Sequence, residues 1–241
     1  IFGTTFGYID AMAEMAEEYP DVIFLHCSGY LNNDTNFANY FGKMYQPRYL
    51  SGLAAGAMTD SNKIGYVAAF PIPEVIRGIN AFAAGVNEVN PEATVEVVWT
   101  FTWFGPEAET QAANALLEKG ADVLAQHQDS TATGLAAEAA GAKWISYNTA
   151  YGQDSAPEAF VTAPVWDWGP YYVNIVEQII DGTFTTESYW GGMETGLVSL
   201  YDLSSDVPSD TATLIAEKTE AIIDGTLEVE IVEEEFISNV I

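Results

Sequence analysis

Short apolar runs alternate along the chain with longer stretches in which apolar residues recur at helical spacing. Residues 63–70, KIGYVAAF, form one such run, which ends at Pro71 and Pro73. Apolar residues then recur every three or four positions over residues 75–89, which predicts an amphipathic helix. The same alternation predicts further strands at residues 94–101, 121–127 and 143–148. Strands and helices at this spacing favour right-handed βαβ units in a parallel sheet with helices on both faces.

Similar elements precede and follow this central region. Before it, the pattern predicts strands at residues 22–27 and 36–41, and helices at residues 9–18 and 47–58. After it, the pattern predicts a strand at residues 159–166, a helix at 169–182, a short strand at 196–200 and a helix at 211–225. The predicted fold class is therefore α/β, with two lobes that are each a parallel sheet flanked by helices.

The order of the elements predicts that the chain crosses between the lobes more than once. The N-terminal lobe is predicted to comprise residues 1–62 and 169–200, and the C-terminal lobe residues 63–168. Residues 201–241 are predicted to form a helix and an acidic tail, to which no role is assigned. The chain opens with IFGTTFGY rather than Met, which reads as the end of a strand, so we expect the N-terminal lobe to be truncated at its start.

The charge balance is strongly acidic. Seven Lys and Arg residues face 35 Asp and Glu residues, giving a formal net charge of −28. Nucleic acid and anionic membrane surfaces are disfavoured as partners, because both require a basic patch. The favoured interpretation is a solvated surface suited to salty surroundings, with a specific cationic partner as the alternative. No apolar run reaches the roughly 18 to 20 residues that span a bilayer.

Ligands of open parallel sheets bind beyond the carboxyl ends of the strands. Here the predicted ends are residues 4–8, 70–73, 102–104, 126–129, 147–148 and 166–168. Aromatic residues such as Phe70, Trp103 and Trp166 alternate at these ends with polar residues such as Asp129 and Asn148. A flat heterocycle needs both rings to stack on and a few directed polar groups at its edge. The strand ends therefore predict a site for a small, flat ligand.

Each of these residues has another interpretation. A single aromatic residue at a strand end can simply fill the core or the interface between lobes. Asp129 and Asp167 each precede a predicted helix, so either can be an N-cap. His127 lies between two glutamines, and a lone histidine there is more often a hydrogen-bonded structural residue than a catalyst. The co-occurrence of rings and polar groups at several strand ends is therefore stronger support than any one residue.

The sequence lacks the motifs of common catalytic sites. It contains no GxSxG elbow, P-loop or HExxH motif, and no GxGxxG follows a strand. One cysteine and two histidines provide no cluster with metal-ligand spacing. We therefore expect no cofactor, no metal and no enzyme activity. An enzyme would need a positioned carboxylate cluster or a metal, and the abundant carboxylates mark no such pair.

Several long segments resemble a known family. They are KIGYVAAFPIPEVIRGINAF, WTFTWFGP, AQHQDS, and VWDWGPYY followed by YWGGMETG. These segments are similar to the basic membrane protein (BMP) family of ABC transporter substrate-binding proteins, and the resemblance runs from residue 1 to about residue 225. It implies a type I periplasmic-binding-protein fold, a purine nucleoside or nucleobase bound between two lobes, and delivery to a membrane permease.

The resemblance also implies individual ligand contacts. Trp103 and Phe104 match an aromatic contact of the family, Asp129 matches the polar position in QHxDS, and Phe6 matches the aromatic residue of the TTFGY loop. Asp167 stands where relatives usually have Asn in WNWGPYY, which could change the ligand edge that is read. The candidate ligand-binding residues are Phe6, Phe70, Trp103, Phe104, His127, Asp129, Asn148, Trp166, Asp167 and Trp190.

Three features depart from the family pattern. The family begins with further βα units, the acidity exceeds the usual pattern, and the tail after Glu228 does not match. The resemblance nevertheless predicts an extracytoplasmic solute-binding component of an ABC importer, in the periplasm or on the outer face of the cytoplasmic membrane, lipid-anchored or secreted. The expected partners are a purine-type ligand and an ABC permease, without nucleic acid, and the expected state is a monomer. The alternative is a ligand-sensing module of the same fold that serves a receptor or regulator.

Overall fold

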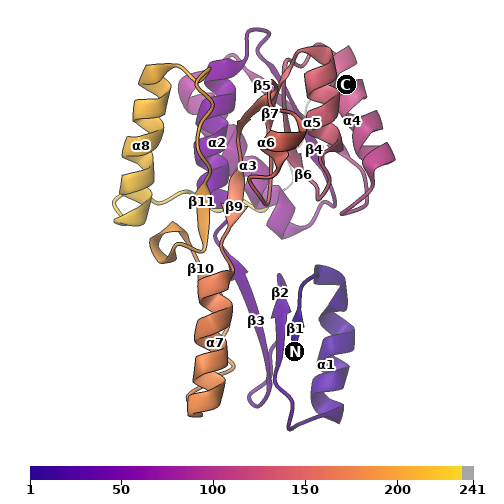
Figure 1. The fold of residues 1–241 in the computed structure, drawn as a ribbon, viewed down its shortest axis with the longest axis vertical. Coiled ribbons are helices and arrows are strands. Elements are labelled where there is room, and N and C mark those ends of the chain that lie inside the picture. The colour runs from indigo at the N-terminus through magenta and orange to yellow at the C-terminus, as the bar shows by residue number, and fades with distance from the viewer. Residues whose placement is uncertain (235–241) are drawn as a thin grey trace. The chain divides into compact units, whose positions relative to one another are not determined.

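The computed structural model describes residues 1–234, which form two compact units (Figure 1). Unit 1 consists of residues 1–43 and 167–198, and unit 2 consists of residues 44–166 and residue 199 onward. The chain therefore passes between the units three times. None of the helices within residues 1–234 is long and apolar enough to cross a membrane.

Unit 1 contains a four-stranded parallel sheet. The strand order is β1 (Phe2–Gly3), β2 (Phe24–Cys27), β3 (Phe37–Gly42) and β10 (Tyr189–Gly191). The other elements are η1 (Phe6–Tyr8), α1 (Ile9–Glu18), α7 (Gly169–Asp181) and η2 (Met193–Thr195). Met12 and Ala16 of α1 pack on Phe24 and Phe37 of the sheet. The short strand β10 comes from the late return of the chain, and the sequence pattern did not predict it.

Unit 2 contains a five-stranded parallel sheet in the order β5 (Thr94–Trp99), β4 (Lys63–Ala68), β6 (Val123–His127), β7 (Lys143–Ile145) and β8 (Phe160–Thr162). Its helices are α2 (Tyr45–Met58), α3 (Pro73–Val89), α4 (Pro106–Glu118), α5 (Ala132–Ala140), α6 (Gly152–Ser155) and α8 (Ser209–Ile223). A separate pair is formed by β9 (Pro164–Trp166) and β11 (Val198–Leu200). This arrangement confirms the predicted α/β class with parallel sheets.

The strand order of unit 2 contains a topological switch point. After β4 the chain adds β5 on one side of it, and then returns to add β6 on the other side. In open α/β sheets, ligands bind beyond the carboxyl ends of the strands at such a switch point. The topology therefore places a candidate site next to Ala68 of β4 and His127 of β6, which are register partners.

Most predicted elements of unit 2 are confirmed, with one correction. The central strands β4 and β6 are buried, and helix α5 ends at Gly141, whose φ of 71° suits glycine. The single strand predicted at residues 159–166 is instead two strands, β8 and β9. Pro164 lies at the break, and its missing N–H group prevents a continuous ladder.

Residues 44–62, which the sequence analysis assigns to the N-terminal lobe, group with unit 2 in the structure, and residues 167–168 group with unit 1. Helix α2 explains the first difference, because it packs extensively against α3 of unit 2. Residues 199–234 likewise belong to unit 2, where α8 packs on α2.

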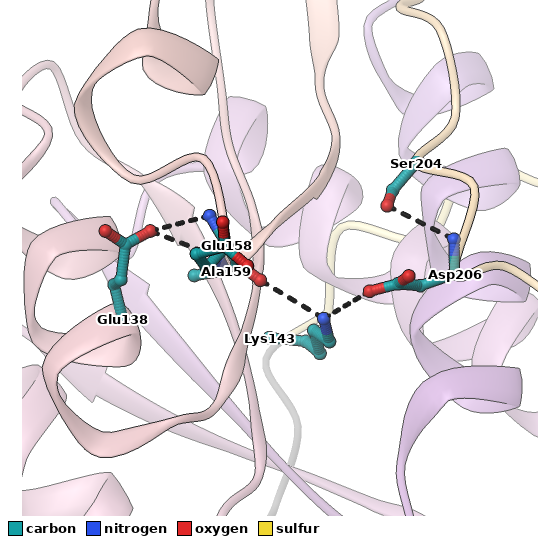
Figure 2. A network of polar contacts seen from close by, with 6 residues as sticks. All are labelled: Glu138, Lys143, Glu158, Ala159, Ser204 and Asp206. Atoms are coloured by element: carbon teal, nitrogen blue, oxygen red, sulfur yellow. Dashed lines mark hydrogen bonds and ion pairs between the residues drawn. The ribbon is translucent and has the colours of Figure 1, made fainter.

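A polar network fastens the amino ends of β7 and β8 (Figure 2). The Glu138 carboxylate accepts hydrogen bonds from the backbone N–H groups of Glu158 at 2.8 Å and Ala159 at 3.2 Å. Lys143 donates to the Glu158 carbonyl oxygen at 3.1 Å and pairs with Asp206 at 2.5 Å. The network thus ties α5, both strands and the returning chain together at the end of the sheet opposite the switch point.

Two glycines allow α2 and α3 to pack with their backbones in close approach. A Cβ atom on Gly52 would lie 2.1 Å from the Phe82 carbonyl oxygen, and one on Gly85 would lie 2.1 Å from the Tyr49 carbonyl oxygen. Real Cβ atoms do not approach backbone oxygens this closely, so any larger residue would push the helices apart.

We expect Gly85→Ala to lower the free energy of unfolding by about 1–3 kcal/mol, because overpacking forces backbone shifts. The control is Gly78→Ala on the same helix, where the nearest heavy atoms lie 3.8 Å from a new Cβ. This control gains helix propensity and should raise the free energy of unfolding by up to about 1 kcal/mol. Urea denaturation measures both. Equal effects of the two substitutions would contradict the close approach of the helices.

Candidate ligand-binding site

The predicted ligand contacts are distributed over both units. Phe70, Trp103, Phe104, His127, Asp129, Asn148 and Trp166 belong to unit 2, and Phe6, Asp167 and Trp190 belong to unit 1. The unit 2 residues follow or end strands β4, β5, β6, β7 and β9, so they gather at the carboxyl ends that frame the switch point. Unit 2 therefore contains the larger part of the candidate site.

Aromatic rings form a continuous row in unit 2, which we call the ring row. Its members are Phe101, Phe70, Trp103, His127 and Tyr147, with successive centroid distances of 6.4, 5.4, 6.2 and 4.5 Å. The rings are tilted or edge-on to one another, as aromatic pairs prefer. Phe101 and Tyr147 were not among the predicted contacts. The position of Tyr147 just after a buried strand was a usable signal.

The site has an outer and an inner layer. Phe101 and Phe104 are 64% and 65% exposed, and Phe70 and Trp103 are partly exposed, so these four residues form the outer layer. His127 and Tyr147 are only 2% and 8% exposed and form the inner layer beneath them. His127 is therefore covered in this structure and lies beneath the accessible rings.

A polar edge lies beside the rings. The Asn148 side-chain amide donates a hydrogen bond to the Asp129 carboxylate at 2.7 Å, and its oxygen accepts one from the Trp166 indole N–H at 3.1 Å. Asp129 was considered as an N-cap, but Thr131 occupies the N-cap position of α5. Its carboxylate instead lies exposed at the polar edge. Three predicted contacts are thereby brought together: Asp129, Asn148 and Trp166.

Unusual backbone conformations mark the same strand ends. Phe101 and Asn148 have φ angles of 56° and 70°, in the left-handed region that residues other than glycine seldom adopt. Such conformations cost about 1–3 kcal/mol each and persist where the surrounding structure enforces them, often at binding sites. In unit 1, Ser28 has a φ of 61° directly after β2.

Buried Glu109 connects the two loops that carry Trp103 and Asp129. It is fully buried on α4, where its carboxyl group accepts hydrogen bonds from the Gly105 backbone N–H at 3.0 Å and the Ser130 hydroxyl at 2.5 Å. The Asp129 backbone N–H also donates to the Trp103 carbonyl oxygen at 3.0 Å. These bonds hold the aromatic loop against the loop that bears the carboxylate. Sequence reasoning did not find Glu109.

The pKa values of His127 and Asp129 are shifted in opposite directions. Burial lowers the pKa of His127 well below its usual value, and the positive charges of Arg48 and Arg77 lower it further. Partial desolvation raises the pKa of Asp129, the hydrogen bond from Asn148 opposes this rise, and the Glu109 carboxylate adds to it. At neutral pH the inner layer therefore contains an uncharged imidazole.

In unit 1 the predicted contacts lie on separate local features. Phe6 belongs to η1, in a loop that His26 supports through a 2.9 Å hydrogen bond between its Nε2 and the Thr5 carbonyl oxygen. The Asp167 carboxylate accepts a hydrogen bond from the Gly169 backbone N–H at 3.2 Å at the start of α7, which satisfies one orphan donor of that helix. Trp190 lies on β10 and is 40% exposed.

No group of three or more potential ligand side chains within residues 1–234 could hold a metal ion. The polar edge and the ring row together consist of aromatic rings, the Asn148 amide and the Asp129 carboxylate.

Two α/β units joined by three chain passages, each built around a parallel sheet, have the type I periplasmic-binding-protein fold. A solved ABC transporter solute-binding protein from Aeropyrum pernix K1 has the same fold, with a TM-score of 0.82 at 16% identity. The match covers 97% of this chain and 77% of that chain. This confirms the predicted fold.

The particular family follows from the sequence comparison. The family model Bmp, described as ABC transporter substrate-binding protein PnrA-like, matches residues 1–233. The chain belongs to this family, which confirms the resemblance of its sequence segments. The family consists of solute-binding proteins and not of enzymes.

Two similar relatives differ in the ligand that their names give. A Haloferax volcanii protein, named as a glucose-binding protein of an ABC transporter, is 46% identical over 95% of this chain. A purine-binding protein of Brucella abortus is 40% identical over 92% of this chain. The chain spans 58% and 63% of the lengths of these relatives, respectively.

We expect Glu109→Gln to loosen the two loops that Glu109 connects, because an amide cannot accept both hydrogen bonds. The free energy of unfolding should fall by about 1 kcal/mol, and by about 2–3 kcal/mol for Glu109→Ala, which leaves both donors without their acceptor. Amide hydrogen exchange should accelerate at residues 100–105 and 128–131.

The matched control is Glu118→Gln, an equal change of charge at an exposed position of the same helix. It should leave stability and exchange unchanged. Unchanged exchange in both loops of the Glu109 variants would show that the carboxyl group does not hold them.

Proposed function

We propose that this protein is the solute-binding component of an ABC importer and that it takes a purine nucleobase or nucleoside at the ring-lined end of unit 2. The observation that carries the proposal is the combination of accessible rings with a hydrogen-bonded carboxylate and amide at the topological switch point. Membership of the family supports the transport role.

The outer layer offers stacking faces for a planar ring. Trp103 and Phe70 lie 5.4 Å apart, centroid to centroid, and are tilted by 57°, and exposed Phe104 follows Trp103 in sequence. Every nucleobase has a π face, and stacking on an aromatic side chain contributes about 1–3 kcal/mol per base. The outer layer is thus suited to a ligand that is flat and only moderately polar.

The polar edge offers directed hydrogen bonds to the rim of such a ring. The Asp129 carboxylate has acceptor positions beyond the one that Asn148 uses, so it can accept from a purine N–H or amino group. In unit 1, Phe6, Asp167 and Trp190 remain predicted ligand contacts of that unit. Asp167 replaces the Asn usual in the family motif, and as an acceptor without donors it would select a different ligand edge.

The transport role implies a location and a partner. Substrate-binding components of ABC importers act outside the cytoplasmic membrane and deliver their ligand to a permease. We therefore propose an extracytoplasmic location and a membrane permease as partner.

Glucose is the competing ligand, because the name of one relative specifies it. Sugars also stack on aromatic rings, but their hydroxyl groups need many polar partners, each of which must be satisfied when buried. In unit 2 the accessible strand ends are mainly aromatic, with Asp129 and Asn148 as the polar pair, which favours the purine.

Isothermal titration calorimetry on the full-length protein decides between these ligands. We expect saturable heat with at least one of adenine, guanosine, inosine and xanthine, and none with glucose. Binding of glucose alone would overturn the purine proposal and leave the transport role standing. Binding of none of the five would contradict the proposed ligand class.

Two variants test where the ligand binds. Trp103→Ala should weaken purine binding by about 5- to 150-fold, the equivalent of about 1–3 kcal/mol of stacking. Asp129→Asn should change the order of preference among the four purines, because it exchanges an acceptor for a donor.

The control is Tyr151→Ala, which removes a ring that is 78% exposed in the same unit and is not a member of the ring row. It should leave the dissociation constant unchanged. If Trp103→Ala binds as tightly as the control, the ligand does not stack in unit 2.

A further inference from the structure

Arg48 is a fully buried cation beneath the candidate site. It lies on α2 with 0% of its surface exposed, and it is one of only seven Lys and Arg residues in a chain of net charge −28. Its Nη1 donates a 2.7 Å hydrogen bond to the backbone carbonyl oxygen of Gln126, the residue directly before His127. This bond ties α2 to the carboxyl end of β6.

The guanidinium group also lies against aromatic faces. Its Cζ is 4.0 Å from the ring centroid of Tyr147 and 5.6 Å from that of Tyr66. Tyr147 in turn lies 4.5 Å from His127, centroid to centroid. Arg48 thus continues the ring row on its buried side.

Burying a cation destabilises the fold unless its partners compensate for the hydration that it loses. Within the described part of the chain, Nε and Nη2 of Arg48 have no hydrogen-bond acceptor. Compensation comes from one carbonyl oxygen and from the two tyrosine rings, and cation–π contacts contribute about 2 kcal/mol when desolvated. An apolar residue would fill this position at lower cost, so packing alone does not account for the arginine.

We infer that Arg48 is a positioning residue of the ligand site: its guanidinium braces Tyr147 and the end of β6 from behind, and so fixes the inner layer on which Trp103 rests. The effect of Arg48 on ligand binding rests on the proposed function. The bracing of Tyr147 and β6 by Arg48 does not. A planar guanidinium can stack on a ring and donate in its own plane at once, which a lysine ammonium cannot do.

The charge of Arg48 has a second consequence for the inner layer. The charged and titratable groups around His127 are Arg48 on α2, Glu74 and Arg77 on α3, and Tyr147 after β7. The Glu74 carboxylate lies 3.8 Å from His127 Nε2, beyond hydrogen-bond distance, and although its charge favours a protonated ring, burial outweighs it. Arg48 and Arg77 oppose protonation and thereby add to burial in lowering the pKa of His127.

The lowered pKa of His127 determines how the stability of the fold depends on pH. A depressed pKa in the folded state means that the unfolded chain binds the proton more tightly, so acid destabilises the fold as pH falls through the unfolded value of about 6.5. In the native protein His127 stays neutral and the ring row keeps its packing. Without Arg48, His127 would protonate at a higher pH and disturb the inner layer.

The first test uses the ligand-free, full-length protein. The chain has only two histidines, so ¹⁵N-histidine NMR resolves His127 and His26 as two titration curves. We expect His127 to titrate well below its usual pKa of about 6.5 in the native protein, and its titration to shift to higher pH in Arg48→Met. An ordinary pKa near 6.5 for His127 in the native protein would overturn the inference.

The second test measures guanosine binding between pH 5.5 and 8, a range in which the nucleoside is uncharged. We expect the native dissociation constant to be constant. Arg48→Met should bind about tenfold more weakly at pH 7 and weaker still at pH 5.5. Arg48→Lys keeps the charge but not the planar fork, so its binding should be weakened without pH dependence.

Lys63→Met is the control, since it removes the same charge from the amino end of β4, the opposite end of the sheet. It should bind like the native protein. Circular dichroism checks folding. If Arg48→Met fails to fold, guanosine binding by Arg48→Lys and the His127 titration of the native protein still test the positioning role of Arg48.

A folded Arg48→Met with native binding and native His127 titration would overturn the inference. Failure of the native protein to bind guanosine would count against the proposed ligand alone, because the His127 titration needs no ligand.

Discussion

The close approach of α2 and α3 is the constraint on which the candidate site of unit 2 depends. Gly52 and Gly85 let each helix touch the other's backbone, which sets α2 deep enough to bury Arg48 under the end of β6. Helix α3 begins at the switch point and brings Glu74 and Arg77 to the same place. The accessible rings therefore rest on a polar layer whose position is decided by a contact between two helices.

The sequence predicted the strand–helix order, the parallel sheet and the strand ends, because apolar periodicity and βαβ spacing are local signals. It did not reveal the inner layer. Arg48 and Gln126 are 78 positions apart, and nothing in the neighbourhood of either residue marks their contact. His127 was predicted as a ligand contact because a strand end is visible in sequence, whereas its burial depends on rings from other loops. Glu109 escaped notice because carboxylates are too numerous for any one of them to stand out.

The two ends of the unit 2 sheet differ in physical character. At the carboxyl ends lie a buried guanidinium without a carboxylate partner among the described residues, a desolvated imidazole and left-handed backbone at Phe101 and Asn148, all of which cost stability. At the amino ends of β7 and β8, Lys143 pairs with Asp206, and Glu138 and Lys143 each bond to backbone groups (Figure 2). Several costly features thus gather where a ligand would bind, although Asn62 before the amino end of β4 is left-handed as well, with a φ of 59°.

Both histidines of the chain are completely or almost completely covered, and burial lowers the pKa of each. Histidine is the side chain that ordinarily changes charge near neutrality. Because both histidines are buried and have lowered pKa values, the side chains of this chain contribute little buffering near neutral pH. Its large negative charge is therefore nearly invariant from mildly acidic to mildly basic water, and ionic strength, not acidity, is what alters the electric field around it.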